Sequence, residues 1–259
     1  MPAKELFPYE PTDRLISEFS ASDWEAALSA SPIEGLQMLR SAIVKRLSQE
    51  INTTVDADNI VVTNGSQEGL DLLGWLAKNI SETVPGRANV AITQKPTYLG
   101  FMSAAEPYGC QVEPYALNTI EGVNALRRDL EKKQKAGLPL PALIYAMPTF
   151  GNPDGDMMSL DVRKEILKIA QDFNIPIAED NPYGALRYEG EIPPTLLELS
   201  KDYPGAKVIY LGTVSKTFTP GTRIGWTVAP KEIVEKLKGY KRETTGGANS
   251  FSQVLVAKF

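Results

Sequence analysis

One lysine and one arginine lie close together in residues 210–226, a segment rich in small hydroxyl residues. Lys216 follows the apolar run 206–211, and Arg223 comes seven positions later, after Pro220-Gly221. A lysine at a strand end can form a Schiff base, and an arginine held nearby by a rigid turn can bind a phosphate. The pair favours a phosphorylated aldehyde as cofactor, whereas an isolated Ser-Lys dipeptide is more often a solvated surface feature.

Residues 64–69, Asn-Gly-Ser-Gln-Glu-Gly, are a second candidate because they open a predicted helix. Gly65 lets the backbone come close to a ligand, and the first N–H groups of the helix, around Ser66 and Gln67, favour a phosphate. Taken alone, such a sequence is more often a plain helix start with Ser66 as its N-cap. Arg223 would add a bidentate phosphate contact, although a surface ion pair is the commoner role of an arginine.

An acidic residue, Asp180, ends the run 174–179. Asp180 is well placed to face a pyridine nitrogen, and its charge would keep that nitrogen protonated, so that the ring acts as an electron sink. If the strand continues, Glu179 points to the opposite face. We therefore favour Asp180 as the partner of the ring.

Three further side chains could contact a flat cofactor. Tyr98 follows Pro96-Thr97 at a strand end and could stack on the ring, although a core or interface tyrosine is an equally good interpretation. Tyr183 and Asn152 could each donate a hydrogen bond to a ring oxygen. For Asn152, in Asn-Pro-Asp-Gly, the simpler alternative is a β-turn with no other role.

The chain contains no histidine. Ser-His-Asp triads, Cys-His pairs and histidine-ligated metal sites are therefore excluded within it. A general base must be a lysine, an acidic residue, a tyrosine or a cysteine, which adds weight to Lys216.

The composition is that of an ordinary globular protein, with 259 residues of which 42% are hydrophobic and 23% charged. A net charge of −5 offers no broad basic field, so a nucleic-acid partner is not expected. No stretch approaches the roughly 20 apolar residues that span a bilayer, so no membrane partner is expected either. The single cysteine, Cys110, fits a reducing compartment, and we expect a cytoplasmic protein.

Strand-like and helix-like segments alternate along most of the chain, which predicts an α/β fold with a mostly parallel sheet. In such sheets, sites form beyond the carboxyl ends of the strands, where the candidate residues also fall. The predicted strands are 59–63, 88–93, 110–115, 142–146, 175–178 and 207–211. The predicted helices are 23–28, a stripe through Leu36, Leu39, Ile43 and Leu47, and 67–80, 124–136, 161–173, 231–242 and 250–259.

Five motifs in order give the chain a family resemblance: Gly-Ser-Gln from 65, Pro-Thr-Tyr from 96, Pro-Thr-Phe-Gly-Asn-Pro-Asp-Gly from 148, Glu-Asp-Asn-Pro-Tyr-Gly from 179 and Ser-Lys-Thr-Phe-Thr-Pro-Gly-Thr-Arg-Ile-Gly-Trp from 215. From about residue 35 onward it resembles the class I/II, fold-type-I aminotransferases, closest to the 2-aminoadipate, kynurenine and aromatic branch. The resemblance implies a three-layer α/β/α large domain that binds pyridoxal 5′-phosphate (PLP).

The resemblance also implies a role for each candidate residue. Lys216 would be the Schiff-base lysine, Asp180 the partner of the pyridinium nitrogen, and Tyr98 the stacking ring, with Lys216, Asp180 and Tyr183 as the catalytic residues. Tyr183 and Asn152 would contact the ring hydroxyl. The phosphate would be held by the loop of Gly65, Ser66 and Gln67 together with Thr213, Ser215 and Arg223.

The implied reaction is a transamination that moves an amino group from an aromatic amino acid, 2-aminoadipate or a similar donor to a 2-oxo acid. Other PLP reactions on the same fold (a β-lyase or synthase), a cofactor-binding but inactive fragment, and a ligand-binding domain of a regulator are the alternatives. The family implies a homodimer.

We expect residues 1–50 to be an N-terminal arm and helix belonging to a small domain, and 51–259 to be the large domain, interrupted at its C-terminal end. The family's arginine for the substrate carboxylate has no counterpart in the sequence. Gly151, Asp154 and Thr213 stand where relatives usually carry glutamine, threonine and serine.

Overall fold

The computed structural model describes residues 5 and 7–259, so residues 1–4 and 6 of the predicted arm lie outside the described residues. The chain divides into two compact units. The first unit comprises residues 1–69 and 211–259, and the second comprises Leu70–Tyr210. The boundary predicted near residue 50 remains a prediction.

The fold is α/β with a mostly parallel sheet, as predicted. Within the described residues the sheet has seven strands in the order β1-β7-β6-β5-β4-β2-β3. The β2–β3, β2–β4 and β4–β5 pairs are parallel, and the β1–β7 pair is antiparallel. The strands are β1 Ile60–Thr63, β2 Arg87–Gln94, β3 Gln111–Tyr115, β4 Leu140–Ala146, β5 Ile177–Asp180, β6 Val208–Thr213 and β7 Gly225–Val228.

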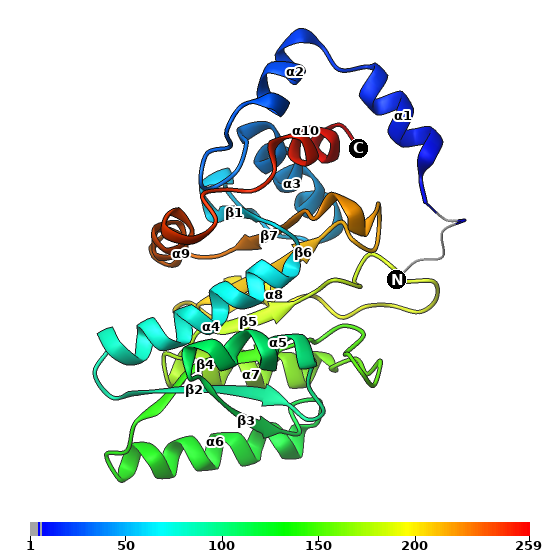
Figure 1. Cartoon of the computed structure of the whole chain (residues 1–259). Helices are drawn as coiled ribbons and strands as arrows, with labels where there is room; N and C mark the ends of the chain where they lie inside the picture. Colours follow the sequence, from blue (N-terminus) through cyan, green and yellow to red (C-terminus); the bar gives the residue numbers. More distant parts are fainter. Residues whose placement is uncertain (1–4, 6) are drawn as a thin grey trace. The chain divides into compact units, whose positions relative to one another are not determined.

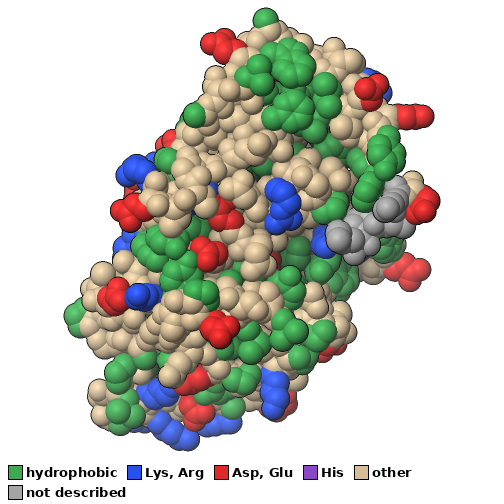
Figure 2. Space-filling view, viewed as in Figure 1, with side chains coloured by type: hydrophobic (Ala, Val, Ile, Leu, Met, Phe, Trp, Pro, Cys, Tyr) green, Lys and Arg blue, Asp and Glu red, His purple; other side chains and the backbone are tan. Residues whose placement is uncertain are grey.

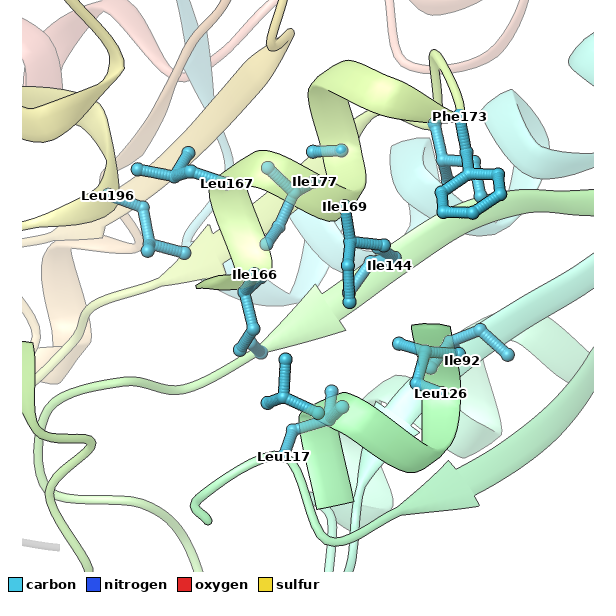
Figure 3. Close-up of a cluster of buried hydrophobic side chains, with 14 of the residues drawn as sticks. Ile92, Leu117, Leu126, Ile144, Ile166, Leu167, Ile169, Phe173, Ile177 and Leu196 are labelled. Atoms are coloured by element: carbon cyan, nitrogen blue, oxygen red, sulfur yellow. The ribbon is translucent and has the colours of Figure 1, made fainter. Parts of the chain in front are cut away.

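In the second unit, helices cover one face of the strands and enclose a cluster of buried hydrophobic side chains (Figure 3). α6 Ile120–Lys135 and α7 Leu160–Asp172 pack together, and the short α8 Leu196–Leu199 packs on α7. Their apolar stripes meet alternate residues of the strands, including Ile92 and Ile144, which are almost completely buried. Burial of apolar surface is the main term that stabilises this unit.

The opposite face of the same strands is covered by α5 Leu99–Ala105, with α4 Ser66–Thr83 beside it (Figure 1). Phe101 of α5 stacks on Tyr145 of β4 with ring centroids 4.1 Å apart. A Cβ on Gly74 of α4 would lie 2.7 Å from the carbonyl oxygen of Ala104, so glycine permits the close approach of the two helices. Side chains alternate across a strand, which is why Tyr145 faces α5 while Ile144 faces α6 and α7.

The first unit contains β1 and β7 together with helices α1 Tyr9–Ser17, α2 Ala21–Leu28, α3 Gln37–Glu50, α9 Lys231–Thr244 and α10 Ser250–Lys258, of which α3 and α9 pack against β1. α10 packs against α2 and α3, as Figure 1 shows. The predicted stripe of α3 is buried at Leu39, Ile43 and Leu47, whereas Leu36 is the N-cap residue. Ser20 begins α2 with a capping box, in which its hydroxyl and the Asp23 carboxylate each accept a backbone N–H.

Four elements were not among the predicted ones: α1, α5, α8 and β7. Seven residues in α5 and four in β7 are too few for a periodic pattern to emerge. Four short 3₁₀ helices complete the described secondary structure, namely η2 Ala57–Asn59, η3 Glu106–Tyr108, η4 Ser200–Asp202 and η5 Pro220–Thr222.

Among the described residues, no helix is both long and apolar enough to span a membrane. Acidic and basic side chains are interspersed on the face shown in Figure 2. Cys110 is buried, and burial raises the pKa of its thiol to about 11, so it behaves as a small apolar residue.

Candidate functional site

In the first unit, the loop of residues 64–66 lies against β7 and the guanidinium of Arg223. A Cβ on Gly225 would lie 2.8 Å from the carbonyl carbon of Gly65 and 2.9 Å from the nitrogen of Ser66. A Cβ on Gly65, which has φ +77°, would lie 2.5 Å from Arg223 Nη2. Only glycine fits at both positions, so the backbone of this loop is closely enclosed.

α4 begins at Ser66, so Gly65 rather than Ser66 takes the N-cap position. Ser66 is thus the first residue of the helix, and its contact with a phosphate stays a prediction. Gln67 is exposed on the first turn of the helix. The start of an 18-residue helix carries partial positive charge and N–H donors, which together attract an anion.

Arg223 follows η5 in the left-handed conformation, with φ +50°. Its Nη2 donates to the backbone oxygen of Asn64 at 3.4 Å, which brings the guanidinium to the loop of residues 64–66. The predicted turn before it is formed by Pro220 and Gly221, and the Thr219 hydroxyl accepts from the nitrogen of Gly221. Arg223 is exposed, so its charge is available to a ligand.

Hydroxyl groups order the segment that carries Lys216. Thr213 Oγ1 lies 2.9 Å from the backbone oxygen of Ile224 and 3.0 Å from Ser215 Oγ, and it accepts the N–H of Ser215 at 3.1 Å. These contacts connect the end of β6 to the residue after Arg223. Lys216 is half-buried directly after Ser215. The structure therefore brings Thr213, Ser215 and Arg223 into one group beside Lys216.

In the second unit, Asp180 ends β5 with its carboxyl group buried. Tyr145 Oη donates to Asp180 Oδ2 at 2.7 Å, whereas Oδ1 is buried without a hydrogen-bond partner among the described residues. Burial raises the pKa of Asp180 from its ordinary value of 3.8 to about 6, although the Tyr145 hydrogen bond lowers it. One oxygen of a buried carboxylate is thus left to accept a hydrogen bond from a ligand.

Three other predicted residues interact around Asp180. Burial raises the pKa of Tyr183, and the charges of Tyr98 and Asp180 raise it further. A side-chain hydrogen bond between Asn152 and Tyr183 acts in the opposite direction and lowers it. Tyr98 precedes α5 as its N-cap residue. The second unit therefore brings together Asp180, Tyr183, Asn152 and Tyr98.

Glu179 has a different environment from Asp180, as the alternation of a strand predicts. It accepts from the nitrogen of Leu197 at 3.0 Å, and it is near enough to the buried Arg163 for their charges to interact. Burial raises the pKa of Glu179 to about 7, against the lowering effect of Arg163.

Arg163 also holds the loop that carries Asn152. Its Nη2 donates to the Pro148 oxygen at 2.7 Å and to Thr149 Oγ1 at 3.0 Å, and its Nε donates to the Met158 oxygen at 3.0 Å. Within that loop a Cβ on Gly151 would lie 2.8 Å from Asp154 Oδ1 and 2.9 Å from Gln94 Nε2. Glycine at residue 151 therefore leaves room for the side chains of Asp154 and Gln94.

Sequence reasoning missed Tyr145, Arg163 and the partners of the 64–66 loop. A tyrosine within the apolar run 140–146 carries a signal, because a buried hydroxyl needs a hydrogen-bond partner. Nothing in the sequence of the helix that contains Arg163 distinguished it from an ordinary surface arginine. Among the described residues, no group of three or more acidic or cysteine side chains could hold a metal ion.

A sequence model of the family described as "Aminotransferase class I and II" matches residues 7–259. The chain belongs to this family. The aromatic-amino-acid aminotransferase 1 of Thermococcus litoralis is 34% identical over 261 residues, which cover 100% of this chain and 60% of that protein. The kynurenine aminotransferase of Pyrococcus horikoshii, in a crystal structure with PMP, superposes with a TM-score of 0.86 at 32% identity, covering 99% of this chain and 61% of that chain.

This class I and II aminotransferase chain is also similar to a transcriptional regulator. The uncharacterized HTH-type transcriptional regulator YisV of Bacillus subtilis is 31% identical over 256 residues, which cover 98% of this chain and 49% of the regulator. The chain thus spans about half to three fifths of the length of the curated relatives that it matches.

Proposed function

We propose that this chain is the cofactor-binding part of a PLP-dependent transaminase, which moves an amino group from an amino acid to a 2-oxo acid. Membership of the class I and II aminotransferase family supports the proposal. The observation that carries it is the buried Asp180 carboxylate, whose Oδ1 has no partner among the described residues. Such an oxygen suits the N–H of a protonated pyridine ring.

The residues of the first unit fit a phosphate. The helix start at Ser66, the guanidinium of Arg223 and the hydroxyl of Ser215 can donate hydrogen bonds to an anion, and Thr213 orients Ser215 by accepting its backbone N–H. Gly65 and Gly225 leave room that a Cβ would fill. We propose that these groups, with the loop through Gln67, hold the phosphate of PLP.

The residues of the second unit fit a hydroxypyridine ring. Asp180 would accept from the ring nitrogen, Tyr183 and Asn152 would contact the ring oxygen, and Tyr98 would stack on its face. A cation opposite Asp180 would favour its charged form and so lower the pKa that burial raises. PLP, when bound, supplies a ring that withdraws electrons from the substrate α-carbon.

Lys216 is the amine that would hold the cofactor aldehyde. Its Nζ, when not bonded to the cofactor, would be placed to act as the base that takes the α-proton of the substrate and returns it. No histidine is present to share that role.

We further propose aromatic amino acids, 2-aminoadipate or similar compounds as amino donors. The similarity to an aromatic-amino-acid aminotransferase and to a kynurenine aminotransferase supports this class of donor. The family resemblance also favours a cytoplasmic homodimer. Sedimentation of the purified chain as a monomer at micromolar concentration would argue against the dimer.

The test of the cofactor assignment is titration with PLP. The wild-type chain should develop a visible absorption band, and borohydride should then fix the mass of the cofactor on the peptide that contains Lys216. Lys216→Ala should abolish both signals, whereas the exposed Lys201→Ala serves as the matched control and should keep them. An undiminished band in Lys216→Ala would contradict the role of this lysine.

A second candidate function is a ligand-binding domain that does not catalyse amino transfer, which the similarity to YisV favours. Both candidates predict PLP binding. Incubating the PLP-loaded chain with an aromatic amino acid and 2-oxoglutarate separates them, because only a transaminase produces glutamate in proportion to the amino acid consumed.

A further inference from the structure

A fully buried lysine lies behind the 64–66 loop in the first unit. Lys241, on α9, has a side chain that is 0% exposed, and its Nζ lies 2.8 Å from Oε1 of Glu68, whose side chain is 9% exposed. Taking two charges out of water costs more than their attraction commonly returns, and an apolar pair of similar volume is often at least as stable. The ion pair therefore calls for an explanation other than stability.

The Glu68 carboxylate holds the residue that begins the loop. Its Oε2 accepts from the backbone nitrogen of Asn64 at 2.5 Å and from Asn64 Nδ2 at 3.2 Å. Its Oε1 accepts from Thr245 Oγ1 at 2.6 Å as well as from Lys241. Both carboxylate oxygens are thus engaged, and the backbone of Asn64 is held from within the first turn of α4.

Asn64 in turn contacts the phosphate-binding groups proposed above. Its backbone oxygen accepts from Arg223 Nη2, and the next residue is Gly65, where an added Cβ would meet the same guanidinium. Its side chain reaches Gly247 and Asn249 after α9. A shift of Asn64 would therefore move both the helix start and Arg223.

Charge gives Lys241 a separate role. An unpaired carboxylate in the first turn of α4 would repel a phosphate at the same helix start. The ammonium of Lys241 neutralises Glu68, so the carboxylate can hold Asn64 without weakening the attraction of the helix start for an anion.

We propose that Glu68 and Lys241 are positioning residues for the cofactor phosphate: Glu68 fixes the loop of residues 64–66, and Lys241 cancels the charge of Glu68. This inference rests on the proposed binding of PLP. It predicts that the two residues affect the affinity for the phosphate group and not for the pyridine ring.

The test compares PLP with pyridoxal, which lacks the phosphate. Dissociation constants for both are measured by absorbance titration on the 259-residue chain, with far-UV circular dichroism as the check on folding. Glu68→Gln should weaken PLP binding about tenfold and pyridoxal binding less than about twofold, because a charged hydrogen-bond acceptor is lost. Lys241→Met should weaken PLP binding at least as much, since it leaves the carboxylate unpaired.

Two further variants separate positioning from general damage. Glu235→Gln is the matched control, because this exposed glutamate of α9 pairs with Lys238 at 3.0 Å and lies away from the loop; it should leave both constants unchanged. The double variant Glu68→Gln/Lys241→Met removes both charges. It should recover the stability lost in Lys241→Met and still bind PLP as weakly as Glu68→Gln does.

Equal weakening of PLP and pyridoxal in Glu68→Gln, or no weakening, would overturn the inference while leaving the proposed function intact. So would a double variant that recovers PLP affinity together with stability. A wild-type chain that binds neither compound would overturn the proposed function, and the inference with it.

Discussion

The Asp180 carboxylate costs the folded chain free energy whenever it is ionised. Burial raises its pKa from 3.8 to about 6 despite the hydrogen bond from Tyr145. Since one pKa unit corresponds to about 1.36 kcal/mol, the ionised form destabilises the fold by about 3 kcal/mol. Between pH 3.8 and about 6 the folded state binds the proton more tightly than the unfolded state does. The free energy of unfolding therefore falls as the pH rises through this window and stays lower above it.

Asp180→Asn removes this charge and keeps an oxygen for the Tyr145 hydroxyl. Its amide nitrogen takes the place of Oδ1, which has no hydrogen-bond partner among the described residues. A buried donor without a partner costs about 1–2 kcal/mol, which offsets part of the stability gained by removing the charge. We expect the cofactor-free variant to be about 1–2 kcal/mol more stable than wild type at pH 8. At pH 4 the folded wild type is already protonated, so most of the gain is absent and the same unpaired donor should leave the variant about 1 kcal/mol less stable than wild type.

Urea unfolding followed by far-UV circular dichroism at pH 4 and pH 8 measures these differences. The matched control is Asp129→Asn, because Asp129 also accepts from a tyrosine, Tyr115, at 3.3 Å, but its side chain is 44% exposed. That variant should change the unfolding free energy by less than about 1 kcal/mol at either pH. Saturating PLP should reverse the order of wild type and Asp180→Asn, since only the carboxylate can accept from a ring N–H. An Asp180→Asn variant that is less stable than wild type by the same amount at both pH values would refute the reasoning.

Two further substitutions test the local geometry. Gly65→Ala should weaken PLP binding about tenfold or more in an absorbance titration, because its Cβ would displace the Arg223 guanidinium. The control is Gly86→Ala, because Gly86 also has a positive φ, +75°, but nothing lies within 4 Å of its added Cβ. This variant has similar backbone strain and should keep the wild-type affinity. Arg163→Met should lower the free energy of unfolding in urea by about 3–5 kcal/mol, since it leaves buried acceptors and Glu179 without their cation. Arg127→Met breaks a more exposed ion pair with Asp172 and should cost less than about 1 kcal/mol; equal losses in the two variants would count against the buried role of Arg163.

Most of the sheet could be predicted from sequence because its strands are apolar runs separated by helices with a clear stripe. The run 142–146 lies inside β4, and 161–173 nearly coincides with α7. β7 could not be predicted, because its four residues follow a turn and pair with β1, which lies more than 160 positions away in sequence. Pairing over such distances has no local pattern.

The candidate ligand groups could be predicted because each follows a strand or opens a helix, where parallel sheets place their sites. Their partners could not. The Tyr145 hydroxyl reaches Asp180 across 35 positions, and Lys241 reaches Glu68 across 173. In a run that is buried throughout, such as β4, the sequence also does not show which face each side chain takes.

These hidden partners share an energetic property. The Asp180 carboxylate and the Glu68–Lys241 pair are buried charges. Apolar side chains of similar volume in their place would remove the cost of burying these charges from the cofactor-free fold. Each lies directly beside a group that we assign to PLP, at the ring nitrogen in one case and at the phosphate in the other. Local choices that oppose stability are expected where a protein binds or reacts. If both charged sites serve the cofactor, Asp180→Asn and the Glu68→Gln/Lys241→Met double variant should each leave the PLP-free chain at least as stable as PLP-free wild type at pH 8. Each should also make the PLP-loaded chain less stable than PLP-loaded wild type. If these charges served only the structure of the chain, the same substitutions would lower the stability of the PLP-free and the PLP-loaded chain alike.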